Sequence, residues 1–200
     1  LVRIGGWVPP EAPSHTGWVP VTSHASGSLQ SQWRTDLGLF NPNATATGVT
    51  LRLHPTSGVL THELELPAMT QVIHADVVSL LGFTGSAALE VVSEAPIKVS
   101  SRTYNLVAST ATCYPNGTFG QDYEAFTTAE GLAAGEVAYL TRLVESADYR
   151  TNIALTNTGP TQAQATVALL DGVGAQLASY QVTLAPGEYN LTARLSERRG

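Results

Sequence analysis

At 200 residues the chain is long enough to bury one or two hydrophobic cores, and its apolar fraction of 43% is that of a globular protein. Charged residues make up only 13%, and the net charge of −6 argues against nucleic-acid binding, which needs clustered Lys and Arg. No apolar run reaches the ~18 residues of a membrane-spanning helix. The sole cysteine, Cys113, excludes an internal disulfide.

The first 14 residues predict an extended N-terminal arm. Gly5-Gly6, Pro9-Pro10 and Pro13 interrupt any regular element there. Apolar residues lie between these breaks, and we expect them to anchor the arm as a donated strand in an open groove. They are Leu1, Val2, Ile4, Trp7 and Val8.

Beyond the arm, apolar and polar residues alternate with a period of two, which predicts half-buried strands. The apolar positions are Leu37 and Leu39, then Val49, Leu51 and Leu53, then, after a turn at 55–58, Leu64 and Leu66. This turn would place His62 opposite Leu51 on the return strand.

The next stretch predicts one helix and one hairpin. Asp76 to Gly82 has a capping Asp, helically spaced apolar residues and a terminal Gly, so we expect a short helix. Leu89 with Val91 and Ile97 with Val99 then predict a hairpin around residues 94–96. The fold class is therefore all-β.

An internal repeat organises the chain. Trp33-Arg-Thr-Asp-Leu-Gly-Leu-Phe-Asn41 recurs 116 positions later as Tyr149-Arg-Thr-Asn-Ile-Ala-Leu-Thr-Asn157, with four identical positions. The same shift matches Thr50 with Thr166 and Gly58 with Gly174. A two-residue slip then matches Leu66 with Leu184. The lead-in repeats too, as Gly17-Trp-Val19 and Gly135-Glu-Val137.

These residues resemble a tandem immunoglobulin-like repeat of secreted bacterial proteins. The resemblance is carried by Trp33-Arg-Thr-Asp-Leu-x-Leu-x-Asn-Pro42, Ser101-Arg-Thr-Tyr-Asn105, Gly117-Thr-Phe-Gly-Gln121 and Arg150-Thr-Asn152, and it covers most of residues 17–195. It implies two immunoglobulin-like β-sandwich units and an extracellular or cell-surface location. It implies no catalytic residue or ligand.

The repeat divides the chain into an arm at 1–14, a first sandwich at 15–128 and a second at 129–200. The second unit reaches the approach to the helix of the first, so the counterpart of the hairpin at 86–104 is missing. We expect a sandwich short of two strands to expose unpaired backbone and core, so that either another segment covers it or the C-terminus has been cut away.

The sequence offers no recognisable set of catalytic residues, so we predict that the protein is not an enzyme and uses no cofactor. His54, His62 and His74 are the only histidines close enough to suggest a metal site, and their spacing along the strands favours ordinary strand positions over zinc. We predict a structural role for the repeated motif, in which Arg pairs with a neighbouring strand and Asp or Asn holds a turn. Its members are Arg34, Thr35, Asp36, Arg150, Thr151 and Asn152.

Surface features leave two functions open. Asn43, Asn116 and Asn190 lie in glycosylation sequons, and we expect the first two to lie in loops. Exposed aromatics such as Trp7 and Trp18 would allow a carbohydrate-binding accessory module with a glycan partner. The favoured function is an extracellular structural or adhesive protein. Its identical subunits would associate into a filament by donating the arm to the incomplete second unit.

Overall fold

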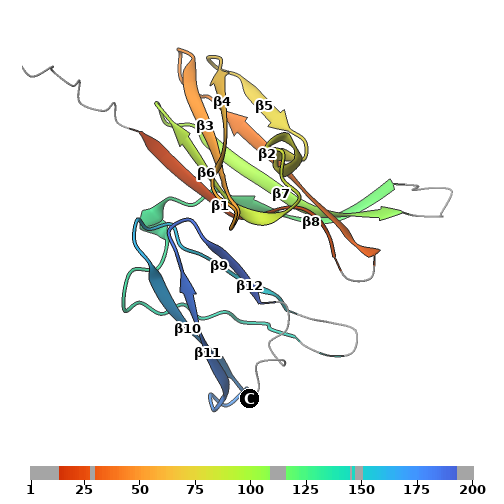
Figure 1. The fold of residues 1–200 in the computed structure, drawn as a ribbon, viewed down its shortest axis with the longest axis vertical. Coiled ribbons are helices and arrows are strands. Elements are labelled where there is room, and N and C mark those ends of the chain that lie inside the picture. Colours follow the sequence, from red (N-terminus) through yellow and green to blue (C-terminus); the bar gives the residue numbers. More distant parts are fainter. Residues whose placement is uncertain (1–13, 28–29, 109–115, 145, 147–150, 193–200) are drawn as a thin grey trace, which may run out of the picture.

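The computed structural model of the chain describes residues 14–27, 30–108, 116–144, 146 and 151–192. This part of the chain is almost entirely strand and turn, so the predicted all-β fold is confirmed (Figure 1). The short helical pieces include α1 (Val77–Leu80) and a 3-10 turn, η2 (Thr128–Glu130). The strands are β1 (His15–Ser26), β2 (Gln32–Phe40), β3 (Thr47–His54), β4 (Leu60–Leu66), β5 (Gln71–His74), β6 (Gly85–Ser93), β7 (Lys98–Ala108), β8 (Asn116–Glu124), β9 (Ile153–Thr156), β10 (Ala163–Leu170), β11 (Gln176–Leu184) and β12 (Tyr189–Thr192).

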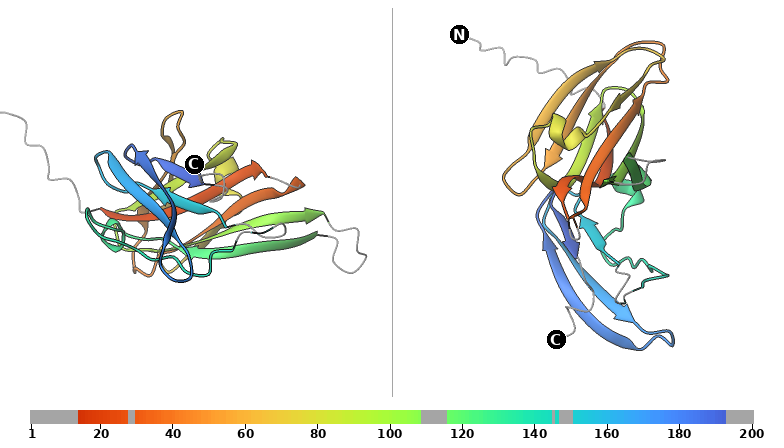
Figure 2. Two further views of the ribbon diagram at one scale, coloured as in Figure 1. Left: turned by 90° about the horizontal axis from the view of Figure 1, so that it is seen from below. Right: turned by 90° about the vertical axis from the view of Figure 1, so that its right-hand side faces the viewer.

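Strands β1 to β8 form the first strand group. Their antiparallel order is β4-β3-β6-β1-β2-β7-β8, with β5 also on β2. Strand β1 belongs to both halves of this path, because His15–His24 pairs with β6 and Ala25–Ser26 pairs with β2. A register shift between Val19 and Thr22 marks an irregularity of the kind that bends a strand. The path therefore folds into two facing layers, as in a β-sandwich (Figure 2).

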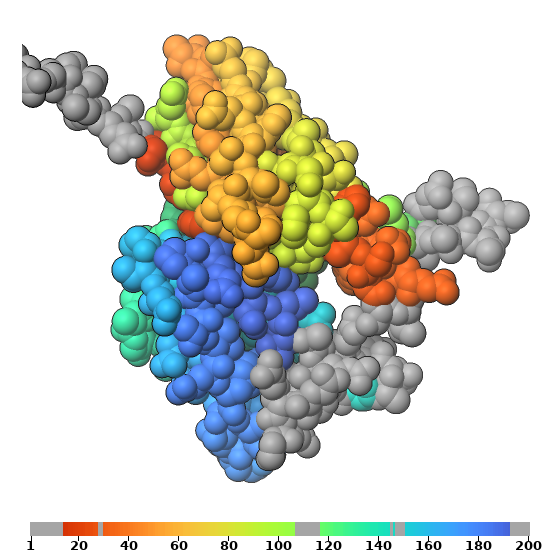
Figure 3. All heavy atoms as spheres, in the orientation of Figure 1, coloured from red at the N-terminus to blue at the C-terminus, as the bar shows by residue number. Residues whose placement is uncertain are grey.

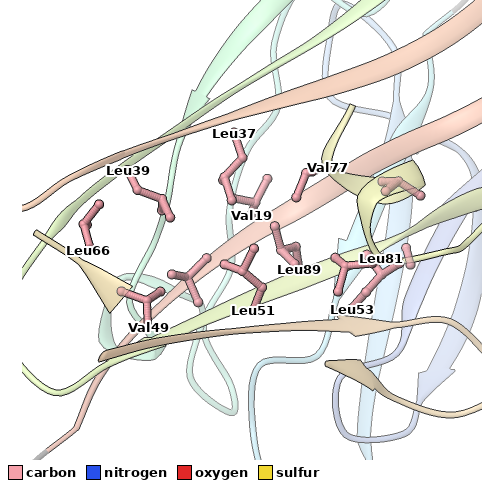
Figure 4. Close-up of a cluster of buried hydrophobic side chains, with 13 residues drawn as sticks. Val19, Leu37, Leu39, Val49, Leu51, Leu53, Leu66, Val77, Leu81 and Leu89 are labelled. Carbon is pink, nitrogen blue, oxygen red and sulfur yellow. The ribbon is translucent and has the colours of Figure 1, made fainter. Parts of the chain in front are cut away.

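The core lies between these two layers. In β3 the pattern of burial alternates strictly, with Val49, Leu51 and Leu53 inside. Leu37 from the facing strand β2 and Leu89 from β6 meet them (Figure 4). Each side chain of this size contributes roughly 1.5–3 kcal/mol when it is fully buried, so the interior holds the two layers together.

Helix α1 closes one end of this core. Asp76 begins it, with its carboxylate accepting a hydrogen bond from the backbone N–H of Ser79 at 3.4 Å. Gly82 follows with a φ of 73°, a left-handed conformation that glycine adopts without strain. Val77 and Val78 are fully buried, so this turn seals the sandwich. The predicted short helix is therefore confirmed.

The predicted hairpin of the strands on either side of residues 94–96 is wrong. Strand β6 pairs with β1 and β3, whereas β7 pairs with β2 and β8. After Ser93 the chain stays on β3, because Glu94 N donates to Gly48 O and Ala95 N donates to the hydroxyl of Thr47. It then crosses to the other layer. Alternation shows which face a strand buries, but not which neighbour it pairs with.

Strands β9 to β12 form the second strand group, which repeats the pairing of β2 to β5. Strand β10 pairs with β11 as β3 pairs with β4: Ala163 lies opposite Leu184 where Thr47 lies opposite Leu66. Strand β9 pairs with β12 as β2 pairs with β5, so that Ile153–Thr192 corresponds to Leu37–His74. The shift is 116 positions on one strand of each pair and 118 on the other, as in the sequence repeat.

A buried asparagine recurs at the end of the equivalent strands β2 and β9. Asn41 and Asn157 are each buried, and each donates through Nδ2 to two backbone carbonyls that lie at matching places. The acceptors are Thr45 and Leu66 for Asn41, and Thr161 and Leu184 for Asn157. Both turns therefore rest on the same side-chain interaction.

Candidate functional site: the open face of the second strand group

Two strand edges of the second group have no ladder partner in the part of the chain that the structure describes. In the first group β6 lies between β3 and β1, and β7 lies beside β2. Strand β10 takes the place of β3 and pairs only with β11, while β9 takes the place of β2 and pairs only with β12. Positions equivalent to β6 and β7 are empty of described strands, so backbone donors and acceptors on β9 and β10 face outward.

An apolar hollow lies between these open edges. Seven residues line it: Leu143, Ile153, Val167, Ala168, Leu169, Ala178 and Tyr180. Its walls from β9 and β10 match Leu37, Leu51 and Leu53 of the first group, which are fully buried under β6. The hollow, about 20 Å³ in volume, therefore lies on the face that Leu89 and Val91 of β6 cover in the first group.

Residues 131–144, which we call the lead-in segment, reach this hollow at Leu143. Val137, Tyr139 and Leu140 are 69%, 80% and 61% exposed, a dense run of apolar residues facing solvent. Their counterparts around Trp18 and Val19 are buried, because β1 there pairs with β6. The lead-in segment therefore has the apolar composition of a strand, but no described strand lies beside it in the place that β6 takes beside β1.

Thr35 and Thr151 of the repeated motif connect these segments to their groups. Ser23 N of β1 donates to Thr35 Oγ1 at 2.8 Å. In the second group Val144 N donates to Thr151 Oγ1 at 3.0 Å, and that hydroxyl also lies 3.0 Å from the Val144 carbonyl oxygen. The motif thus fixes the end of the lead-in segment beside β9, as it fixes β1 beside β2.

The Arg and Asp of the first motif lie in a polar cluster at the start of α1. Arg34 Nε lies 3.4 Å from Asp76 Oδ2, and His24 Nδ1 lies 2.6 Å from the same oxygen. Asp36 Oδ1 accepts from Asp76 N at 3.0 Å and from the Tyr104 hydroxyl at 3.1 Å. Burial, and then the hydrogen bond to Asp36, raise the pKa of Tyr104. Each member bonds another member, so the cluster ties β1, β2 and β7 to the helix.

Sequence reasoning missed three members of this cluster as partners of the motif. His24 and Tyr104 come from β1 and β7, and Asp76 was assigned only a capping role. The side chains meet because β2 lies between β1 and β7 in the sheet. The repeated Arg-Thr-Asp motif and the similar Ser101-Arg-Thr-Tyr-Asn105 run were the available signals. In the second group Asn152 replaces the Asp, and Arg150 lies outside the described residues.

The three candidate histidines divide between two places. The rings of His62 and His74 are 6.3 Å apart and meet edge to face, and burial together with His62 lowers the pKa of His74. His54 instead lies 3.2 Å from Glu90 Oε2, with its ring against Trp18. Across the described residues no three His, Cys, Asp or Glu side chains converge as a metal site.

The sequons differ in how accessible their amides are. Asn43 lies in a turn, half-buried, and its Nδ2 donates to Asn41 Oδ1 at 2.8 Å and to Pro96 O at 2.9 Å. Asn116 begins strand β8 instead of lying in a loop, and Asn190 lies within β12 opposite Leu155. A glycan on Asn43 would replace one of the two amide hydrogens and so break at least one of these hydrogen bonds. The arm residues Leu1, Val2, Ile4, Trp7 and Val8 lie outside the described residues.

The two strand groups meet along β1. Thr156 Oγ1 of β9 donates to Pro20 O of β1 at 2.9 Å, and Phe126, in the link after β8, exchanges two backbone hydrogen bonds of 2.7 and 2.9 Å with Trp18. The Trp18 ring is 5% exposed and 5.1 Å from that of His54, so it has no free face for a sugar. Figure 3 shows the C-terminal strands (blue) directly against the first group (orange).

Strand β12 and the turn before it complete this junction. Burial, and then the neighbouring Tyr123 of β8, raise the pKa of Tyr189 to about 12. Gly187 has a φ of 73° and lies so close to His54 that a Cβ there would be 2.2 Å from His54 Nδ1. The second strand group thus contacts the first through β12 and the turn before it, and these contacts do not cover the hollow.

Comparison with known proteins places the chain in no family. No family model matches it, and no curated protein matches it. A solved structure, that of protein 1070 from Thermotoga maritima, has a TM-score of 0.43 at 14% identity, covering 56% of this chain and 91% of its own. In the described part of the chain no helix is long and apolar enough to cross a membrane. What the fold itself defines is an all-β, sandwich-like protein.

Proposed function

We propose that this protein is an extracellular structural or adhesive subunit whose molecules join by adding a β-strand to the open face of the second strand group. The observation that carries the proposal is the hollow between β9 and β10, lined by residues whose counterparts are fully buried beneath β6. The extracellular setting rests on the resemblance of residues 33–42 and 150–152 to secreted tandem repeats.

An added strand would pair the open backbone edge of this face and cover its apolar side chains. An incoming strand bonds the free backbone groups along β10, and alternate side chains enter the hollow between Ile153 and Val167. Each large apolar side chain buried there contributes roughly 1.5–3 kcal/mol toward the ~8 kcal/mol of a micromolar complex, so the side-chain anchors and the backbone hydrogen bonds have to act together. The exposed apolar residues of the lead-in segment would be covered in the same event.

Sedimentation velocity over a wide concentration range, with negative-stain electron microscopy, tests the proposal. We expect the mass to grow with concentration and the assemblies to be elongated. A chain that keeps its monomeric mass at every concentration and shows no assemblies overturns the proposed function.

Point variants tie the association to the open face. Val167→Asp puts a charge into the hollow and should weaken association at least about tenfold, because a buried unpaired charge costs several kcal/mol. Thr166→Asp is the matched control, since Thr166 is exposed on the same strand. If Val167→Asp loses its circular dichroism spectrum, Leu143→Asp tests the other wall. Unchanged association in the folded hollow variants contradicts the proposal.

A further inference from the structure

The shape of the hollow and the sequence of the arm identify a donor. We propose that residues 1–9 of a second copy of this chain occupy the open face, lying between β10 and the lead-in segment in the register of β6. This inference rests on the proposed function and specifies its partner segment, its direction and its register.

The arm has the residue pattern of β6 and of the link that follows it. Residues 1–9, Leu-Val-Arg-Ile-Gly-Gly-Trp-Val-Pro, align with residues 88–96, Ala-Leu-Glu-Val-Val-Ser-Glu-Ala-Pro, at a constant shift of 87. Val2 and Ile4 take the places of Leu89 and Val91, the two large side chains that β6 sends into the core. Arg3 takes the place of Glu90, so a charged residue, of opposite sign, stands on the face that points away from the core.

The same alignment also places the end of the donated strand. Gly6 falls at Ser93, the last residue of β6, where the inward side chain is small. Pro9 falls at Pro96, in the link at which the chain leaves this sheet for the other layer. A proline cannot donate to a ladder, so in both segments pairing ends before it.

The repeated pairing of the two groups then fixes the register. In the first group Leu89 lies opposite Leu53, and Val91 lies opposite Leu51, with the strands antiparallel. The equivalents of Leu53 and Leu51 are Leu169 and Val167. The donor therefore runs antiparallel to β10 with Val2 opposite Leu169, Arg3 opposite Ala168 and Ile4 opposite Val167.

This placement explains why the hollow has its particular lining. Leu169 and Val167 are on its wall, and Leu143 and Ile153 close it from the lead-in segment and β9. Val2 and Ile4 would project toward them, as Leu89 and Val91 belong to one buried cluster with Leu37. Because donor and acceptor are different surfaces, each copy offers one of each, and the contact propagates as an open chain.

Disulfide trapping measures the register directly. In a Cys113→Ser background, one chain carries Arg3→Cys and a second carries Ala168→Cys, and the two are mixed under mild oxidation. Directly opposed residues have Cα atoms about 4.5–5.5 Å apart, within the range a disulfide spans. We expect a covalent dimer as the main product. The matched control, Arg3→Cys with Thr166→Cys, moves one thiol two residues along the same face and should give several-fold less.

The outcomes separate this inference from the proposed function. A protein that associates, but whose Arg3→Cys chain links no better to Ala168→Cys than to Thr166→Cys, keeps the function and overturns the register. A doubly substituted chain that closes its disulfide within one molecule at every concentration overturns the second copy as the donor. A protein that never associates overturns both.

A peptide provides a second, independent readout. In a variant lacking residues 1–9, a synthetic peptide of those nine residues should raise the thermal midpoint. The same peptide with Ile4→Asp should not. Equal effects from the two peptides, or no effect from the native one, contradict the assignment of Ile4 as an anchor.

Discussion

Replacing Asn41 with alanine probes the turn interaction that the two strand groups share. Asn41 is fully buried, and its Nδ2 lies 2.9, 3.0 and 3.1 Å from the carbonyl oxygens of Thr45, Leu66 and Pro67. Its Oδ1 accepts from the backbone and side-chain nitrogens of Asn43 at 2.9 and 2.8 Å. The two N–H groups of the amide are shared among the three carbonyls, and alanine removes all of these interactions without replacing any.

The expected loss of stability follows from these contacts. A buried carbonyl or amide left without a partner costs about 1–3 kcal/mol, and water entering the space recovers part of it. We therefore expect Asn41→Ala to lower the free energy of unfolding by about 3–5 kcal/mol. Asn157→Ala should cost about 2–3 kcal/mol, because Asn157 makes two bonds through Nδ2 and one to Gly159 N.

Urea denaturation followed by tryptophan fluorescence and circular dichroism measures both variants. Trp18 and Trp33 lie in the first strand group, so fluorescence should report Asn41→Ala more strongly than Asn157→Ala. Thr45→Ala, exposed in the same turn, is the control and should stay within about 0.5 kcal/mol of the parent. A loss below about 1 kcal/mol for Asn41→Ala, or a larger loss for Asn157→Ala, refutes the reasoning.

Two further predictions concern the junction of the strand groups. The hydrogen bond from His54 lowers the pKa of Glu90 below its ordinary 4.5, so the carboxylate stabilises the fold above that pH and loses this effect as pH falls through the folded-state pKa. Chemical denaturation from pH 7 to 3 should show Glu90→Gln least stable relative to the parent at pH 7, and a constant difference would contradict this. Gly187→Ala combines a positive φ with a Cβ 2.2 Å from His54 Nδ1, whereas Gly174→Ala has a φ of 88° and open space. Both should lower the thermal midpoint, Gly187→Ala clearly more, and equal shifts would exclude the His54 contact as the cause.

Local patterns predicted the elements that bury one face. In β3 and β4 the alternation gave the strands, the turn at 55–58 and the placement of His62 opposite Leu51, all of which the structure shows. Strand β1 was not predicted from alternation, because its buried residues come as adjacent pairs. Trp18 and Val19 are both buried, and so are Thr22 and Ser23. A strand that serves two sheets does not alternate, so its sequence carries no simple period.

Longer-range features depended on which strands become neighbours. The polar cluster around Asp76 joins His24, Arg34, Asp36 and Tyr104 from strands β1, β2 and β7. No spacing in the sequence indicates that contact, because it arises from sheet order. For the same reason β6 and β7, which look like the two arms of a hairpin, lie in different layers.

The open face can be inferred from the sequence repeat, because the second unit can be compared with the first position by position. Val167 and Leu169 alternate with Thr166 and Ala168 as Leu51 and Leu53 alternate with Thr50 and Arg52. This is the pattern of a strand with one buried face, yet β10 leaves that face partly exposed. Apolar side chains that alternate in this way stabilise a strand only when a second layer of strands buries them. In the first group that layer is β6, and Val2 and Ile4 of the arm align with Leu89 and Val91, the large core-facing residues of β6. The open edges of β9 and β10 and the apolar hollow between them are therefore the surfaces that the proposed donation of the arm would cover.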